Sequence, residues 1–238
     1  QHMLLTALMD AMRFPLKTAN IILARFDMKA LPMTITRGFG GAQQVTRAVG
    51  SKKFTFSLPL DTSKDVRAAS QKFTYIDPAG GGKNGDETAY AVTGVAHGGL
   101  LNSTVYVRNV TGFPGGYERD KLEALARSVL AFEPDTVFIE KNFGYGAFKE
   151  VFWPVLSRIY EDAGKKPPAA ADDMVSGQKE RRIIDTLEPV LGRGALVLHE
   201  DVLTDESLTL ARYDLRSRYT YSLFHQLAYP YADNVAVD

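Results

Sequence analysis

The chain has 238 residues, of which 45% are hydrophobic and 24% charged, which is an ordinary composition for a globular protein. Its 28 basic and 28 acidic residues cancel, so binding of nucleic acid has to come from a local basic patch and not from the whole chain. The absence of cysteine excludes disulfides, thiolate chemistry and cysteine-ligated zinc, and no apolar run approaches the roughly 20 residues of a membrane span.

The N-terminal quarter shows weak structural signals. Residues 1–3 look like a cloning remnant and are left out of the fold prediction. Apolar positions recur from residue 4 to about 26, and Pro15 interrupts them, so two short helices are expected there. Glycines, a proline and scattered charges in residues 33–69 predict a linker or irregular lead-in with one strand over residues 53–58.

The middle of the chain is rich in strand signals. Three β-like runs, residues 72–77, 88–96 and 104–110, are separated by glycine-rich connections, which predicts a meander of adjacent strands. An amphipathic helix is expected over residues 117–132. Residues 136–139 form a short apolar run that ends in an acid, as expected for a strand buried on both faces.

The C-terminal third alternates between helix and strand signals. Helices are expected over residues 147–163, 178–190 and 219–227, and a strand over residues 195–198. The resulting order, β-β-β-α-β-α-α-β-α, predicts an α/β protein with a mixed sheet and helices on its faces.

The most informative segment is residues 73–88, where a β-like run ends in Asp77 and a glycine loop leads to Asp86 and Glu87. A carboxylate at the end of a buried strand is costly unless a cation compensates it, and neighbouring acids repel one another. Hard divalent ions prefer carboxylate oxygen. The segment therefore predicts a metal site at the edge of the sheet.

Glu140 provides a partner for this site, since Asp77 and Glu140 are each the first acid after a strand-like run. If the two strands are neighbours, their carboxyl ends bring both side chains into one crevice. Alternatively, Asp77 forms a turn with Pro78 and Glu140 caps a loop. Both interpretations stay open at this point.

The glycine loop does not match a nucleotide-binding P-loop. Ahead of Gly82-Lys83, Asp77 stands where a glycine is required, and Asn84 follows where a serine or threonine is required. No other segment matches better, so the chain carries no ATPase signature. A basic cluster, Lys179, Arg181 and Arg182, opens a predicted helix and would either contact phosphates or form a solvated helix face.

Several segments together resemble the nuclease domain of the large terminase subunit of tailed bacteriophages. The resemblance rests on the strand end Ile76-Asp77-Pro78-Ala79-Gly80, followed by Gly82-Lys83 and Asp86-Glu87-Thr88. In these segments the chain is most similar to terminases of short-tailed phages. Residues 139–148, 179–190 and 221–226 extend the resemblance, so that it covers about residues 70–230 in the right order.

The resemblance implies an RNase H-like fold, a mixed sheet whose first three strands are antiparallel, flanked by helices. It implies a metal-dependent endonuclease that cuts concatemeric viral DNA during packaging, with two Mg²⁺ or Mn²⁺ ions as cofactors. Asp77 and Glu140 match catalytic metal ligands, and Asp86 matches a supporting ligand. Asp238 is either the third catalytic acid or the residue just ahead of it.

The resemblance also implies DNA contacts and partners. We expect DNA to be bound by basic side chains, namely Lys83, Lys141, Lys179, Arg181 and Arg182. Residues 1–60 are expected to be the tag remnant, the end of a missing ATPase domain and a linker, and residues 61–238 the nuclease domain. The expected partners are double-stranded DNA, the ATPase domain, the portal protein and the small terminase subunit, with no membrane.

The expected location is the cytoplasm of the host cell and not the mature virion, and the isolated chain is expected to be monomeric. Two alternatives are a related RNase H-like resolvase or integrase, and a non-catalytic docking module of the packaging motor.

Overall fold

A computed structural model describes residues 16–79, 87–98, 103–141, 146–173, 178–215 and 218–228. The strands are β1 Ile22–Ala24, β2 Leu31–Pro32, β3 Ile35–Arg37, β4 Gln44–Val49, β5 Lys52–Ser57, β6 Pro59–Thr62, β7 Val66–Arg67, β8 Gln71–Asp77, β9 Glu87–His97, β10 Ser103–Pro114, β11 Thr136–Glu140, β12 Ala169–Asp173 and β13 Leu196–His199. The helices are α2 Arg119–Phe132, α3 Ala147–Asp162, α4 Lys179–Gly192, α5 Asp201–Leu210 and α6 Leu223–Ala228, with short 3₁₀ turns η1 Thr18–Asn20, η2 Gly41–Gln43 and η4 Arg218–Tyr221. None of the helices in these ranges is long and apolar enough to cross a membrane.

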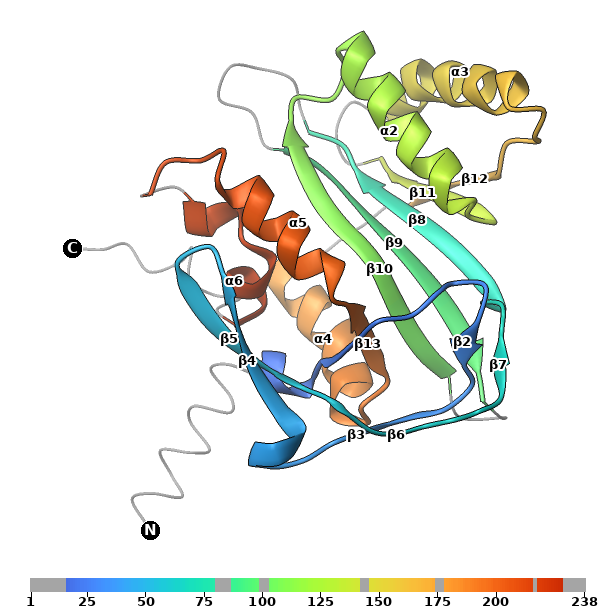
Figure 1. Cartoon of the computed structure of the whole chain (residues 1–238). Helices are drawn as coiled ribbons and strands as arrows, with labels where there is room; N and C mark the ends of the chain where they lie inside the picture. Colours follow the sequence, from blue (N-terminus) through green and yellow to red (C-terminus); the bar gives the residue numbers. More distant parts are fainter. Residues whose placement is uncertain are drawn as a thin grey trace.

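The centre of the fold is a nine-stranded mixed sheet in the order β12-β11-β8-β9-β10-β13-β1-β5-β4 (Figure 1). Strands β8, β9 and β10 are antiparallel neighbours, which confirms the predicted meander. Strand β11 runs parallel to β8, and β12 runs parallel to β11. The ends of β8, β11 and β12 therefore point the same way, which is the arrangement that places their last residues at one edge of the sheet.

Helices cover both faces of this sheet (Figure 1). On one face α2 and α3 lie side by side and bury Ile76, Val92, Val137 and Ile139 against their apolar stripes. On the other face α4, α5 and α6 pack against β10, β13 and β5 in a second core cluster. Alternation along β8 buries Thr74 and Ile76, so Asp77 belongs to the face of α4, α5 and α6.

The N-terminal segment differs from the prediction. Residues 22–24 form a strand and not the end of a helix, because Ile22 and Leu23 are both buried where β1 lies between β13 and β5. The predicted helix before Pro15 lies outside the described residues. The strand expected over residues 53–58 is confirmed as β5, but the expected irregular lead-in is wrong, since it also contains β3, β4, β6 and β7. The division at residue 60 stays a prediction, and β1, β4 and β5 share the sheet of β8–β11.

Two elements after residue 70 were missed in the sequence. Strand β12 has the sequence Ala-Ala-Ala-Asp-Asp and little intrinsic strand propensity, and it forms by pairing along the whole of β11 at the edge of the sheet. Helix α5 begins one residue after β13, and no glycine or proline marks a turn between them in the sequence. The remaining helices and strands occur within a few residues of their predicted bounds.

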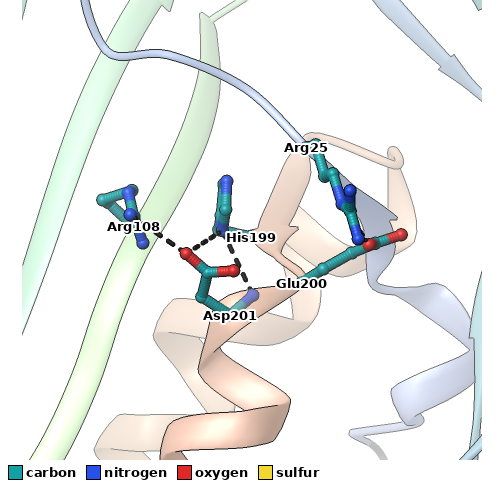
Figure 2. A network of polar contacts seen from close by, with 5 residues as sticks. All are labelled: Arg25, Arg108, His199, Glu200 and Asp201. Carbon is teal, nitrogen blue, oxygen red and sulfur yellow. Dashed lines mark hydrogen bonds and ion pairs between the residues drawn. The ribbon is translucent and has the colours of Figure 1, made fainter.

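Polar contacts fix the junction between β13 and α5 (Figure 2). Arg108 on β10 forms an ion pair of 3.1 Å with Asp201 at the start of α5. The backbone N–H of Asp201 donates to Nδ1 of His199 over 3.1 Å, and Arg25 pairs with Glu200 at 2.7 Å. Burial lowers the pKa of His199, and the positive charge of Arg108 lowers it further. The imidazole is therefore neutral and accepts this hydrogen bond. The start of α5 is thereby tied to β10, β13 and the segment after β1.

Candidate active site

A cleft of about 610 Å³ opens beside the end of β8, on the face covered by α4, α5 and α6. Asp77 and Glu140 both line it, at the ends of the neighbouring parallel strands β8 and β11. The other lining residues are Pro78, Ala79, Glu87, Ala89, Val110, Thr111, Gly112, Lys179, Glu206, Thr209, Thr220, Tyr221, Leu223 and Gln226. The interpretation of Asp77 and Glu140 as neighbours in one crevice is confirmed.

Small residues leave the space beside Asp77 open. Asp77 lies opposite Ala89 on β9, and Ala89 lies opposite Gly112 on β10. A Cβ atom on Gly112 would lie 2.8 Å from Oε2 of Glu87, so the Glu87 carboxylate occupies the place that a side chain would take. Small residues on two neighbouring strands, β9 and β10, thus leave room for carboxylates at this end of the sheet.

Glu140 lies in an electrostatically unfavourable position for a carboxylate. Burial raises its pKa, and the nearby charge of Asp77 raises it further. The Tyr75 hydroxyl, 3.3 Å from Oε2 of Glu140, opposes this shift, as do Lys179 and Arg182. A cation bound between Asp77 and Glu140 would relieve their repulsion.

Tyr75 also donates a hydrogen bond of 2.9 Å to Oδ2 of Asp173, at the end of β12. Tyr75 and Asp77 stand two residues apart on β8 and so lie on the same face of the sheet. Asp173 lies opposite Glu140 in the register of β11 and β12. Four adjacent strands, β9, β8, β11 and β12, therefore each place an acid at this end of the sheet.

Two further acids line the cleft, of which Glu206 is buried and Glu87 is half-buried. Burial raises the pKa of Glu87 to about 7, and Oε1 of Glu87 has no hydrogen-bond partner among the described residues. Burial likewise raises the pKa of Glu206, on α5, to about 7, although Ser222 donates to its Oε1 over 2.7 Å. Both groups exchange a proton near neutral pH.

The segment after Asp77 is held by Thr88, which is fully buried. The backbone N–H of Ala79 donates to Thr88 Oγ1 over 3.0 Å, and this hydroxyl donates to the carbonyl of Gly115 over 2.6 Å. A Cβ atom on Gly116 would lie 2.2 Å from the same oxygen, so only glycine fits there. These contacts fix the direction in which the chain leaves β8.

The predicted DNA-binding side chains occupy different surroundings. Lys179 Nζ lies 3.7 Å from Oδ2 of Asp77 and lines the cleft, and Arg182 acts electrostatically on Glu140. Lys141 instead pairs with Asp172 at 2.6 Å, and Arg181 pairs with Asp185 at 3.4 Å. The structure thus brings Lys179 and Arg182 toward the acids, and it engages Lys141 and Arg181 with other carboxylates.

Three predicted site residues, Lys83, Asp86 and Asp238, lie outside the described residues, and their roles stay predictions. Within the described part of the chain, no group of three or more histidine or acidic side chains is arranged to hold a metal ion. Tyr75, Asp173 and Glu206 were missed. The spacing of Tyr75 from Asp77 was a visible signal, whereas the positions of Asp173 and Glu206 depend on long-range pairing and packing.

Comparison with known proteins adds an independent finding. Residues 76–196, just over half of the chain, match the family described as Terminase Bacteriophage T7, Ribonuclease H-like domain. The large terminase subunit of Enterobacteria phage T3 is 35% identical over 229 residues, which is 95% of this chain. The chain spans only 37% of the length of that relative.

Two solved structures are similar at lower identity. The nuclease domain of the large terminase subunit of bacterial virus Sf6 has a TM-score of 0.41 at 12% identity, covering 68% of this chain and 72% of that one. RuvC of Thermus thermophilus has a TM-score of 0.35 at 14% identity, covering 58% of this chain and 90% of that one. The family match and the β8–β9–β10 meander with parallel β11 confirm the resemblance, and the chain belongs to the RNase H-like domain family of the bacteriophage T7 terminase.

Proposed function

We propose that this chain is a metal-dependent endodeoxyribonuclease that hydrolyses phosphodiester bonds of concatemeric viral DNA during genome packaging. The observation that carries the proposal is the pair of carboxylates Asp77 and Glu140, which line one cleft at the ends of neighbouring parallel strands. Membership of the terminase family supports DNA as the substrate and packaging as the process.

The donor set fits a hard divalent ion. Asp77 and Glu140 offer carboxylate oxygen, and the charge of Asp77 raises the pKa of Glu140, so a cation between them would be bound favourably. We propose Mg²⁺ or Mn²⁺, in two sites, with Asp86 and Asp238 as additional ligands. When bound, such ions supply an activated water and stabilise the leaving 3′ oxygen.

The protein's own side chains would orient this chemistry. Thr88 holds the backbone after Asp77, and Tyr75 contacts the carboxylate of Glu140. Lys179 and Arg182 supply positive charge beside the acids, where a DNA phosphate would otherwise meet only negative charge. Lys179 and Arg182 would bind and position the phosphodiester, whereas Asp77 and Glu140 would hold the metal.

The partners follow from the same proposal. In the intact protein the domain would act with an ATPase domain, the portal protein and the small terminase subunit, in the cytoplasm of the host cell. The isolated chain, with no net charge, would bind duplex DNA weakly and with strong dependence on salt. We propose that it is monomeric on its own.

The test is Mn²⁺-dependent nicking of supercoiled plasmid by the wild type, Asp77→Asn and Glu140→Gln. Each substitution removes a ligand and several kcal/mol of transition-state stabilisation, so the rate should fall about 100-fold or more. Glu161→Gln, which removes an exposed acid on α3, serves as the matched control and should cleave normally. Undiminished cleavage by both site variants would overturn the proposal.

A thermal melt separates this function from a docking module without catalysis. An ion that binds only the native state must raise Tm. We expect Mn²⁺ to raise the Tm of the wild type and to leave that of Asp77→Asn nearly unchanged. An equal response of the two proteins would favour the docking module.

A further inference from the structure

One side of the cleft is formed by the last described segment of the chain, η4 and α6. We call residues 218–228 the C-terminal wall. Thr220, Tyr221, Leu223 and Gln226 of this wall line the same cleft as the acids of β8 and β11. The position of the wall therefore sets the space that is left beside those acids.

Glu206 on α5 holds the start of this wall. Its side chain is only 6% exposed, and its Oε1 accepts a hydrogen bond of 2.7 Å from the hydroxyl of Ser222, itself 1% exposed. The backbone N–H of Phe224 donates to the same oxygen over 3.4 Å, and that of Leu223 also bonds to the carboxylate. The first N–H groups of a helix lack partners within the helix, so Glu206 satisfies the start of α6.

The wall has a second anchor on its outer side. At the turn between β4 and β5, the hydroxyls of Ser51 and Tyr219 are hydrogen-bonded, and Lys52 Nζ lies 3.1 Å from Nδ1 of His225. These contacts are partly exposed, whereas those of Glu206 are buried. Helix α5 itself is fixed at its start by the Arg108–Asp201 pair (Figure 2). Glu206 thus links the wall to a helix that is anchored in the sheet.

Among the described residues, no cation offsets the negative charge of Glu206. Burial raises its pKa to about 7, hydrogen bonds from the start of α6 oppose the shift, and no charged group is among the causes. The charged groups around it include Asp201, Asp205 and Arg212 on or after α5, Arg218 and His225 in the C-terminal wall, Glu87 on β9, Asp77 and Glu140 across the cleft, and Lys179 on α4.

We propose that Glu206 is a positioning residue for the cleavage reaction: its hydrogen bonds to the start of α6 hold the C-terminal wall in place and so control access to the cleft. The inference rests on the proposed function for its consequence in catalysis, but the contact between Glu206 and the wall is independent of it.

The hold on the wall depends on protonation. Opening of the wall exposes Glu206 to water, where its pKa returns toward the ordinary glutamate value of 4.5, below its value of about 7 in the closed state. The closed state therefore binds more protons between these values, and raising the pH across this window favours opening. Protonated Glu206 holds the wall more firmly than the ionised form.

Hydrogen exchange of the whole chain, followed by mass spectrometry of residues 218–228 and corrected for the intrinsic exchange rate, tests the proposal. In the wild type, protection of this segment should fall as the pH rises from 5 to 7, at most about tenfold per unit. Glu206→Gln keeps an acceptor oxygen and stays neutral, so its protection should not change with pH and should exceed that of the wild type at pH 8. Ser222→Ala should lose about fivefold in protection at every pH.

Glu188→Gln is the matched control, because it removes an exposed acid on α4, and it should behave as the wild type. In plasmid nicking, the ratio of kcat/KM between wild type and Glu206→Gln should change between pH 6 and pH 8, whereas the ratio for Glu188→Gln stays constant. The proposal is overturned if Glu206→Gln shows the same pH dependence of exchange as the wild type. Loss of nicking in all proteins with the exchange pattern intact would instead overturn the proposed function alone.

Discussion

Glu140 and Asp173 lie directly opposite one another in the register of the parallel strands β11 and β12, and the hydroxyl of Tyr75 contacts both carboxylates. Two neighbouring carboxylates repel one another. A hydroxyl between them donates a hydrogen bond, which partly offsets this repulsion. Burial raises the pKa of Tyr75, and the hydrogen bond to Asp173 raises it further, so the hydroxyl keeps its proton. The Tyr75 hydroxyl thus links Glu140, which lines the cleft, to Asp173 on the neighbouring strand.

Replacing Tyr75 by phenylalanine removes this donor and leaves the ring in place. The loss of one hydrogen bond to a carboxylate should weaken Mn²⁺ affinity by about five- to tenfold, measured by calorimetric titration, and should lower kcat more than it changes KM for DNA. Tyr160→Phe is the control, because that hydroxyl bonds to Val129 in the layer of α2 and α3. Unchanged Mn²⁺ affinity in Tyr75→Phe would show that Glu140 is oriented by other contacts.

Replacing Gly116 by alanine should disturb the exit from β8. The new Cβ would lie 2.2 Å from Thr88 Oγ1, which holds the backbone of Ala79 just after Asp77. Overpacking of this kind costs about 1–3 kcal/mol of unfolding free energy, and Mn²⁺ should raise Tm less than in the wild type. Gly41→Ala, which meets nothing within 4 Å, should leave both quantities unchanged. Equal Mn²⁺ responses of the two variants would contradict the link between Thr88 and the site.

Stability should depend on pH through Glu206. Its pKa is about 7 in the folded state against an ordinary glutamate value of 4.5, so the native state binds more protons between these values. The contribution to the unfolding free energy therefore falls as pH rises from about 4.5 to 7, then stays constant, and amounts to on the order of 3 kcal/mol. Glu206→Gln lacks this loss, so its stability relative to the wild type should rise between pH 5 and pH 8.

Urea denaturation at the two pH values measures this difference. Glu87, which also titrates near neutral pH, is present in both proteins and cancels. A relative stability that is the same at pH 5 and pH 8 would mean that Glu206 is ionised throughout.

Lys179 should contribute one phosphate contact. Its side chain is 68% exposed, and its Nζ lies beside Asp77, where a DNA backbone would pass. Lys179→Ala should weaken duplex binding for all sequences and reduce the slope of log K against log salt by about 0.9. Lys166→Ala, an exposed lysine between α3 and β12, should leave the slope unchanged. Fluorescence anisotropy at several salt concentrations decides between the two outcomes.

Much of the site was visible in local sequence patterns. Asp77 and Glu140 each follow a β-like run, and alternation along those runs indicates which side chains share a face with them. The glycine loop fails the P-loop match, and because that loop lies outside the described residues this exclusion stays a prediction. Local patterns suffice here because strand ends and side-chain alternation are properties of neighbouring residues.

Other features depended on contacts between distant parts of the chain. Strand β12 pairs with β11 despite its weak propensity, and β1, β4 and β5 join the sheet although their sequence predicted a helix and a linker. Glu206 enters the cleft because α5 packs on β10 and α6 folds back onto α5. Pairing partners and helix packing are decided by burial over the whole domain, which no local pattern encodes.

The sequence alone determined that strand-end acids, Asp77 and Glu140, are candidates for metal binding and that the chain resembles a terminase nuclease domain. Only the tertiary structure decided that β8 and β11 are parallel neighbours, so that these acids meet in one cleft, and that Tyr75, Asp173 and Glu206 surround them. The reason is physical, since a carboxylate's chemistry is local to its residue, whereas its neighbours, burial and pKa are set by the packing of the whole fold.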